Sequence, residues 1–468
     1  MLDEIKSFLH KVLTNFSKSE IERKAGIQAA VSDEMSAAVA LWSWMYADTP
    51  PWASKDVQTM NMPALIAAEL ARLITIEMTS TVSGSARADY INEQYQMAID
   101  SLRQQVEYAC AKGGMVFKPY VDNGRIMVDF IQADSFFPVS FDSSGRMTGA
   151  IFVDQLVKGR KTFTRLESHV INPGGYKIKN TAYMSSNKGN LGGQVSLDSV
   201  DEWADLQPEV TVQNVDRPLF AYFKMPFANT IDNHSPLGVS VYSRAVDLIK
   251  EADKQYSRLL WEFEGSELAI DADYVALAKD AGGGFSLPKL KQRLFRGLNI
   301  SGGTNGSDFY QIFSPAIRDA SLLNGLNALL IRIEDACGLA RGTFSDPQGE
   351  AKTATELKIL KQRSYATVAD SQKSLQAALD DLVYAMDVWA TLYKLAPAGA
   401  YEVSYEWDDS IVTDRDKEYA EKLGMVNQNI ISKAEFRAWY LGETLETAQG
   451  AINIISATEP NLRTLIGE

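Results

Sequence analysis

The sequence predicts a mainly helical α+β protein, because the spacing of its apolar residues changes twice along the chain. Apolar residues recur every three or four positions over residues 18–112, as they do on one face of a helix. Between about residues 115 and 225 they alternate with polar residues, which is typical of β-strands. Long helical patterns return from residue 239. With 468 residues the chain is long enough for two to four domains.

We expect three helices before the first strand. The first covers residues 18–47 and ends at a pair of prolines, which cannot continue the helical hydrogen-bond ladder. The second covers residues 61–78, with Pro63 in a tolerated first-turn position. The third covers residues 89–112 and stops at Gly113.

The first sixteen residues also carry apolar side chains at helical spacing. These are Ile5, Phe8, Leu9, Val12, Leu13 and Phe16. Acidic residues and lysines interrupt the run, so it does not read as a signal peptide. A helix packed within a domain is favoured over a helix lying on a membrane surface.

The middle of the chain predicts an antiparallel sheet of about five or more strands. The expected strands are residues 115–121, 125–131, 136–141, 147–154 and 161–171. The sequence Asp-Asn-Gly at 122–124 is a strong hairpin signal. Residues 185–196 are polar and rich in glycine, which indicates a surface loop, and residues 219–225 indicate a further strand.

Two long helices, 239–265 and 317–337, flank an insertion of different composition. The insertion, residues 266–316, contains glycine-rich stretches and strand-like pieces at 285–290 and 294–300. The two helices can therefore run antiparallel and carry the insertion at their far end. The first of them bears a row of basic residues, Lys250, Lys254 and Arg258, which indicates a solvated face, with contact to DNA or to a neighbouring subunit as the alternative.

A loop rich in glycine, proline and charge, residues 338–352, joins the second of these helices to a much longer one. Gly338 is a helix stop, and Thr353 with Glu356 has the spacing of a capping box. The pattern then runs without glycine or proline to Pro397, for about 43 residues or roughly 65 Å. A compact monomer rarely needs such a rod, whereas a large assembly does.

The last part of the chain predicts one strand and three short helices. The strand covers residues 401–407, and the helices cover 414–426, 433–441 and 445–455. Ser432 and Glu435 have the spacing of a capping box at the start of the second helix. This spacing indicates a helical C-terminal lobe.

Composition excludes several classes of protein. The net charge of −14 argues against non-specific binding of the outer surface to nucleic acid, although it suits a protein that lets DNA pass without gripping it. No run of eighteen apolar residues is present, so we expect no membrane span. Two distant cysteines and three scattered histidines predict neither a disulfide framework nor a metal site.

No catalytic motif emerges from the sequence. The phosphate-binding pattern of ATPases is missing, as are the dinucleotide-binding and nucleophile-elbow motifs. Glu406, Asp408 and Asp409 form the densest carboxylate cluster, which permits a hydrolase or a metal site, but an acidic turn at a strand end is favoured. We therefore expect a scaffold without cofactors, not an enzyme.

Several short stretches, taken in order, resemble the portal proteins of tailed bacteriophages, particularly of siphophages that infect Gram-positive hosts. They are WSWMY at 42–46, PW at 51–52, AKGGMVFKPYV at 111–121, PLGVSVY at 236–242, GLARGTFS at 338–345 and KTATE at 352–356. Each is a loose pattern alone, but their order and spacing extend over most of the chain.

The resemblance implies a portal fold with wing, stem, clip and crown regions that assembles as a ring. It assigns residues 1–238 to the wing, 239–265 and 317–337 to the stem helices, 266–316 to the clip, 338–352 to the tunnel loop, 353–407 to a long helix with a wing-completing strand, and 408–468 to a short crown. The tunnel-loop residues that it places at the channel are Arg341, Thr343, Phe344, Ser345, Asp346, Gln348, Glu350 and Lys352.

The function that the resemblance implies is a DNA channel at one vertex of the capsid. A homo-oligomeric ring, typically of twelve subunits in the virion, would conduct double-stranded DNA without reading its sequence during packaging, retention and ejection. The implied partners are the large terminase subunit, a head–tail adaptor, and the major capsid and scaffolding proteins, with no membrane. The protein would act in the virion, after assembly in the host cytoplasm.

Two other readings remain open from the sequence. One is a different ring-forming or connector protein of the virion, although such proteins are usually much shorter. The other is a hydrolase that uses the carboxylates at 406–409.

Overall fold

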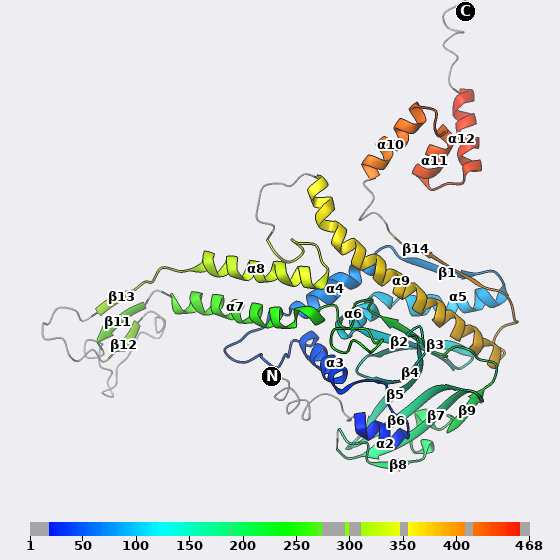
Figure 1. Cartoon of the computed structure of the whole chain (residues 1–468), viewed down its shortest axis with the longest axis horizontal. Helices are drawn as coiled ribbons and strands as arrows, with labels where there is room; N and C mark the ends of the chain where they lie inside the picture. The colour runs from blue at the N-terminus through cyan, green and yellow to red at the C-terminus, as the bar shows by residue number, and fades with distance from the viewer. Residues whose placement is uncertain are drawn as a thin grey trace, which may run out of the picture. The chain divides into compact units, whose positions relative to one another are not determined.

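The computed structural model describes residues 18–187, 189–267, 269–273, 295–298, 310–346, 354–407 and 415–458. It contains helices and sheets in the mixture that the sequence predicts (Figure 1). The chain divides into two compact units, Met1–Glu406 and Trp407–Glu468, and each is described by itself. No helix in the described ranges is both long and apolar enough to cross a membrane.

The N-terminal helices are shorter and more numerous than expected. They are α2 (Lys18–Ala25), α3 (Asp33–Tyr46), α4 (Met62–Thr75), α5 (Ala86–Ile99) and α6 (Leu102–Lys112). The single helix expected at 18–47 is wrong, because Gly26 turns into the left-handed region at φ +70° and the Ser32 side chain caps α3. The helix expected at 89–112 is also broken, at Asp100 and Ser101.

The strands form two sheets in the middle of the chain, where one was expected. The first has the order β10-β2-β3, with β2 (Gly114–Asp122), β3 (Arg125–Gln132) and β10 (Ala221–Lys224). The predicted hairpin joins β2 to β3, and Asn123 and Gly124 both have positive φ, as its two-residue turn requires.

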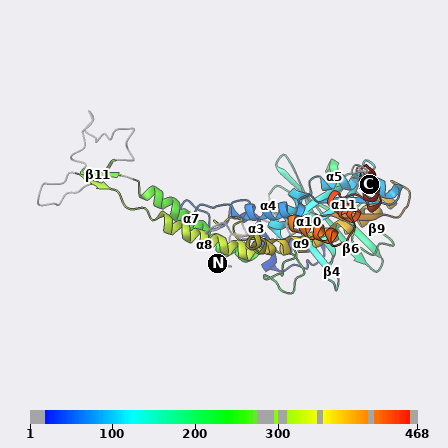
Figure 2. The same cartoon turned by 90° about the horizontal axis from the view of Figure 1, so that it is seen from above.

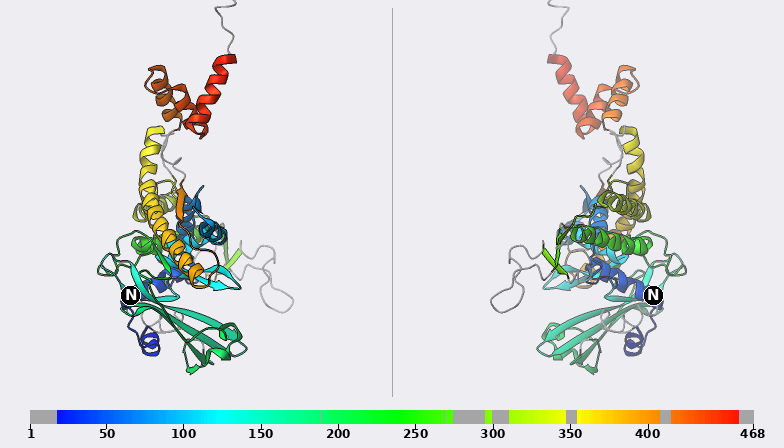
Figure 3. Two further views of the ribbon diagram at one scale, coloured as in Figure 1. Left: turned by 90° about the vertical axis from the view of Figure 1, so that its right-hand side faces the viewer. Right: turned by 90° about the vertical axis from the view of Figure 1, so that its left-hand side faces the viewer.

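The second sheet has six strands and extends below the C-terminal end of α9 in Figure 3. Its order is β4-β5-β6-β7-β8, with β9 also paired to β7. The strands are β4 (Phe136–Phe141), β5 (Met147–Lys158), β6 (Lys161–Asn172), β7 (Gly175–Ser185), β8 (Gly193–Val195) and β9 (Glu209–Val212). The stretch 185–196, expected as a loop, thus includes the short strand β8.

A buried network of polar side chains joins the two sheets. Lys118 of β2 donates to Glu167 of β6 across 2.6 Å, and His169 lies 2.7 Å from both Glu167 and the Tyr176 hydroxyl. Burial alone would raise the pKa of Glu167, but the charge of Lys118 and the bond from His169 hold it well below the usual range. Burial lowers the pKa of His169, which favours the neutral imidazole in the folded protein.

The 39-residue helix α9 (Ala354–Leu392) packs along this unit. It begins next to Thr353, as predicted, although Thr353 itself lies outside the described residues. Its buried face contacts α4, α5 and the β10-β2-β3 sheet. The residues of that face are Val368, Leu375, Leu379, Leu382, Val383 and Met386.

The strand expected near the end of the unit finds its partner early in the chain. β14 (Glu402–Glu406) pairs antiparallel with β1 (Thr79–Ser83). The sequence did not indicate β1, because five residues with two buried side chains are too short to show a clear period.

Two glycines that lie far apart in the sequence meet where α6 ends. A Cβ on Gly113 would lie 2.7 Å from the Gly238 carbonyl oxygen, and a Cβ on Gly238 would lie 2.1 Å from the Gly113 carbonyl oxygen. Close by, the Val241 N–H donates to the Cys110 carbonyl, and the Tyr242 hydroxyl donates to the Trp42 carbonyl. Three of the stretches that carry the portal resemblance therefore contact one another here.

The second unit contains α10 (Arg415–Asn427), α11 (Lys433–Leu441) and α12 (Leu445–Thr458). These helices agree with the predicted ranges to within three residues. Ser432 and Glu435 form the predicted capping box. Aromatic contacts between α10 and α11 link Tyr419 to Phe436 and Tyr440.

Candidate functional site

The candidate site is built on two antiparallel helices, α7 (Val246–Gly265) and α8 (Asp319–Cys337). They lie side by side and lead away from the sheets (Figure 2). The helix expected from residue 239 begins only at 246, because residues 239–242 are held in a non-helical conformation against the end of α6. The predicted end of α8 is confirmed, since Gly338 adopts the left-handed conformation at φ +73°.

Polar contacts hold the two helices together. At the far end, the Arg318 guanidinium donates twice to the Glu262 carboxylate, across 3.1 and 2.8 Å, and the Arg318 backbone N–H donates to the same carboxylate. Closer to the sheets, the Gln255 amide donates to the Leu322 carbonyl. The Arg318 bonds lower the pKa of Glu262. The helices are thus fixed in register at two levels.

In the described part of the insertion between these helices, three short strands pair with one another. β11 (Ala269–Asp273) pairs in parallel with β12 (Phe295–Leu298) and antiparallel with β13 (Tyr310–Phe313). The strand expected at 294–300 is confirmed by β12, and the piece expected at 285–290 lies outside the described residues. The sequence did not indicate β11 or β13.

The segment after α3 fixes the near end of α7. The Trp52 indole N–H donates to Asp253 across 2.8 Å, and the Met60 N–H donates to the other oxygen of that carboxylate across 2.9 Å. Beside them, the Gln58 N–H donates to the Ser257 hydroxyl. Burial raises the pKa of Asp253, which these bonds partly offset. One turn of α7 is therefore joined to the helical core of the unit.

The loop after α8 is tied to a fully buried carboxylate, Glu334. Its Oε1 accepts the N–H groups of Phe344 (2.6 Å) and Ser345 (2.8 Å). Its Oε2 accepts the Ser345 hydroxyl (2.7 Å) and the Gly342 N–H (3.2 Å). Four donors from one short stretch thus converge on one side chain, which replaces the water that this carboxylate would otherwise bind.

Both neighbouring helices add further ties to the loop. From α9, Ser364 accepts the Ala340 N–H across 2.6 Å and Thr367 donates to the Gly338 carbonyl. From α8, Asn327 exchanges two hydrogen bonds with the backbone of Asp346. Residues 338–346 therefore form a fixed turn.

Five of the predicted tunnel-loop residues fall in this fixed turn. Arg341 makes a bidentate pair with Asp335 at 3.1 and 2.8 Å, which offsets its charge. Thr343 donates to the Ala340 carbonyl, Ser345 is buried and Phe344 is half-buried, while Asp346 is exposed. The other three predicted residues, Gln348, Glu350 and Lys352, lie outside the described residues.

Sequence reasoning missed Glu334 itself. The residue sits next to Ile333 in the apolar stripe of α8, and an acidic residue there usually marks the edge of the solvated face. Its burial depends on the turn that folds back over it. The one sequence signal for such a turn is the high glycine and serine content after Gly338.

The basic row on α7 remains a candidate for DNA contact. Lys254 pairs with Glu251 across 2.7 Å, Lys250 is half-buried and Arg258 is exposed. These contacts agree with a solvated face of α7. Contact of the basic row with DNA stays a prediction.

The carboxylates considered for catalysis do not form a described cluster. Glu406 accepts a hydrogen bond from Thr79 across the β1–β14 pair, while Asp408 and Asp409 lie outside the described residues. Where the structure describes side chains, no three His, Cys, Asp or Glu residues are grouped to hold a metal ion. Both cysteines are buried, and burial raises the pKa of each thiol.

A family comparison gives this architecture its context. The model of the family described as "Phage portal protein, SPP1 Gp6-like" matches residues 54–449, most of the chain. The chain belongs to this family. It is therefore a phage portal protein and a component of the virion, in a family whose role is structural.

A comparison with solved structures also finds similar chains, of which one is described here. A chain in the neck of the native GTA particle, computed with C12 symmetry, is similar to this portal protein over 91% of its length and 98% of that chain, with 13% identity and a TM-score of 0.46. No curated protein matches the chain.

Proposed function

We propose that this portal protein forms a ring whose central channel conducts double-stranded DNA at one vertex of the capsid. The observation that carries the proposal is the α7–α8 pair, joined through a turn anchored on Glu334 to the 39-residue helix α9. Copies of such a rod around an axis enclose a hole. The net charge of −14 per chain favours a wall that repels DNA, so that the duplex slides without being gripped.

The regions of the chain take the roles that the resemblance implies. Residues 1–238 form the wing, 239–265 and 317–337 the stem, and 266–316 the clip, which faces the large terminase subunit during packaging and a head–tail adaptor afterwards. Residues 353–407 complete the wing and 408–468 form the crown. Twelve subunits surround the channel in the virion, with the major capsid and scaffolding proteins outside and no membrane involved.

The tunnel loop, residues 338–352, divides into two parts in this proposal. The anchored turn 338–346 is the root, and its basic residue Arg341 is already paired. The gating part then begins after Asp346 and includes Gln348, Glu350 and Lys352. The protein has no catalytic step of its own, and the terminase supplies the energy for DNA movement.

Electron microscopy of the purified protein tests the ring. We expect annular particles with a central hole. A protein that remains a single compact particle at every concentration would overturn the proposal.

A deletion of residues 347–352 tests the gating part of the loop. This deletion spares the four bonds to Glu334, so we expect intact rings but less packaged or retained DNA. A matched control replaces the same six positions with glycine and serine, which keeps the span and removes the side chains. If the deletion variant packages and retains DNA normally, the gating role is wrong.

A further inference from the structure

A cavity of about 200 Å³ lies between the β4–β5 turn, β10 and α9. Small residues of the turn and of α9, among them Gly145, Ser374 and Ala378, line it and leave the space open. A cavity of about 150 Å³ holds benzene, so this one has room for an aromatic ring with a small substituent. Its apolar surface comes from Met147, Pro218, Phe220 and Tyr222.

The charged side chains of the lining are Arg146, Lys224 and Asp381. Two cations and one carboxylate leave an excess of one positive charge. The whole chain carries a net charge of −14, so the local excess has the opposite sign to the chain. A group with one negative charge would balance it.

Both basic side chains of the lining keep donors for a further partner. The Lys224 ammonium donates to the Pro236 carbonyl across 3.3 Å, and it forms no ion pair with a carboxylate in the described ranges. The Arg146 guanidinium lies 3.6 Å from the Asp381 carboxylate, which is longer than a hydrogen bond of about 2.7–3.2 Å. Ammonium and guanidinium groups have several N–H donors each, so both can bind an additional anion.

The carboxylate of the lining is shared between two arginines. Asp381 lies 3.6 Å from Arg146 and 3.7 Å from Arg217, which is outside the lining. Burial raises the pKa of Asp381, and the two arginines offset this only in part. A titratable group with a shifted pKa in a cavity is typical of binding sites.

Three neighbouring carboxylates are bonded to other donors. Asp142 accepts the backbone N–H groups of the β4–β5 turn. Asp216 accepts the Tyr384 hydroxyl, and Asp380 accepts the Tyr405 hydroxyl. Where the structure describes side chains, none of the three bonds to a basic side chain of the lining.

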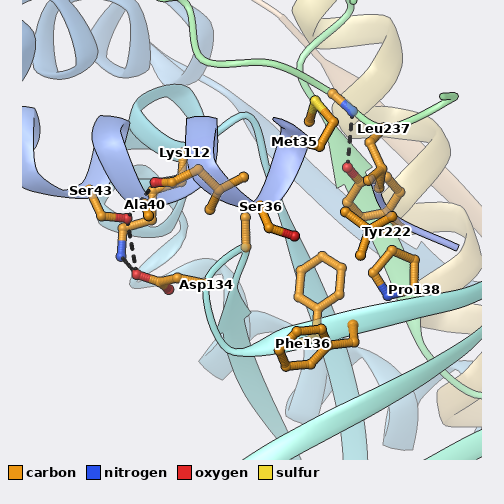
Figure 4. Close-up of a pocket in the computed structure, with 15 residues that line it drawn as sticks. Met35, Ser36, Ala40, Ser43, Lys112, Asp134, Phe136, Pro138, Tyr222 and Leu237 are labelled. Carbon is orange, nitrogen blue, oxygen red and sulfur yellow. Dashed lines mark hydrogen bonds and ion pairs between the residues drawn. The ribbon is translucent and has the colours of Figure 1, made fainter. Parts of the chain in front are cut away.

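A smaller cavity that also includes Tyr222 has the opposite arrangement (Figure 4). Its volume is about 60 Å³, and it lies against α3. The Lys112 ammonium donates to Asp134, which also accepts the Ser43 hydroxyl. The charges of this cavity thus neutralise each other, so charge complementarity points to a ligand in the larger cavity only.

We propose that the larger cavity binds a single carboxylate that is carried by an apolar group. The carboxylate lies between Arg146 and Lys224. The apolar group packs against Phe220 and Tyr222. A phosphate monoester fits less well, because it carries nearly two negative charges at neutral pH and would face Asp381. This inference does not depend on ring formation or on DNA conduction.

Ligand-observed NMR with the full-length protein tests the site without any substitution. The probes are benzoate and benzamide, which have nearly the same shape but differ in charge. We expect saturation transfer from the protein to benzoate and about tenfold weaker binding of benzamide. Equal transfer to the two probes, or none to benzoate, would overturn the proposal. Displacement of benzoate by less inorganic phosphate than acetate would assign the site to phosphate groups and overturn the carboxylate.

Two arginine variants show whether the lining makes the contact. Arg146→Gln removes a cation of the lining, and we expect benzoate to bind about tenfold more weakly. Arg217→Gln is the matched control, because it removes the other ion pair of Asp381 but not a residue of the lining. Both arginine side chains are partly exposed, so neither change leaves a buried gap. Equal losses in the two variants would overturn the proposal.

A second pair of probes distinguishes the two sources of such a carboxylate, a free acid and the C-terminus of a partner protein. The peptide acetyl-Gly-Gly-Phe ends in a carboxylate, and its amide does not. Tighter binding of the peptide acid than of benzoate supports a chain end as the ligand, whereas binding of benzoate alone supports a small free acid. Equal binding of the peptide acid and its amide would overturn the carboxylate site.

Discussion

The bonds to Glu334 lead to a sharp prediction for Glu334→Gln. The side chain is fully buried and accepts four hydrogen bonds from three residues of the turn. Glutamine has nearly the same shape but lacks the charge. When the amide oxygen accepts the N–H groups of Phe344 and Ser345, the NH₂ group faces the Gly342 N–H. Both of these groups are donors, so no hydrogen bond forms between them.

The expected loss follows from these contacts. Hydrogen bonds to a charged group contribute about 1.5–3 kcal/mol each. The variant loses one such bond outright and weakens the others by removing the charge, so we expect the turn to be destabilised by about 2–3 kcal/mol. Because about 1.4 kcal/mol is a factor of ten, opening of the turn becomes about 30- to 150-fold more frequent.

Amide hydrogen exchange measures this opening directly. Exchange at Phe344 and Ser345 should accelerate by the factor above, while amides in the middle of α9 stay unchanged. Asp335→Asn is the control, because it removes the partly exposed ion pair with Arg341, and ion pairs at the surface contribute little to stability. The reasoning fails if the Glu334→Gln turn exchanges no faster than the Asp335→Asn turn.

Three further substitutions test other parts of the fold. Gly238→Ala forces a Cβ to within 2.1 Å of the Gly113 carbonyl oxygen, so we expect a loss of soluble folded protein. An unchanged melting temperature would contradict the close approach of these two backbones. Burial lowers the pKa of His169, so the unfolded chain takes up this proton at a higher pH than the folded protein does, and the free energy of unfolding falls below about pH 6.5. His169→Gln removes this contribution. We therefore expect the free energy of unfolding of the variant to fall less steeply between about pH 6.5 and 5, by up to about 1.4 kcal/mol per pH unit. His234→Gln is the control, because that side chain is exposed and lies outside the buried network. Trp52→Phe removes the indole bond to the α7 carboxylate and should lower the free energy of unfolding by about 1.5–3 kcal/mol, measured by denaturant titration.

Elements with strong local signals were predictable from the sequence. Gly338 ends α8, the capping box of Ser432 and Glu435 opens α11, and the turn at 123–124 joins β2 to β3. In each case, a few adjacent residues determine the backbone conformation by their own hydrogen bonds or by their tolerance of positive φ.

Features that depend on distant partners were not predictable. The strand period gives no information on which strands pair, so two sheets could not be told from one. β1 pairs with a strand more than 300 residues later. Around residues 26–32 the apolar pattern continues while the chain leaves the helix, because Gly26 and Ser32 override it.

The candidate site also contains features that the sequence predicts and features that it does not. The two helices, the loop between 338 and 352 and the long helix after it follow from periodicity and helix stops. The burial of Glu334 does not, because it requires that the turn fold back onto α8 and that Ser364 and Thr367 of α9 face it. The sequence indicates where the chain changes direction, but not what fixes that direction.

The length of α9 has a mechanical consequence. Its 39 residues span about 58 Å without a break. The turn is bonded to its first half, at Ser364 and Thr367, and Trp389, which packs near β7 and β9, lies close to its other end. A continuous helix transmits force along its axis instead of absorbing it by bending. We therefore expect a displacement of the turn to move α9 as one unit, together with the strands that pack against its opposite end.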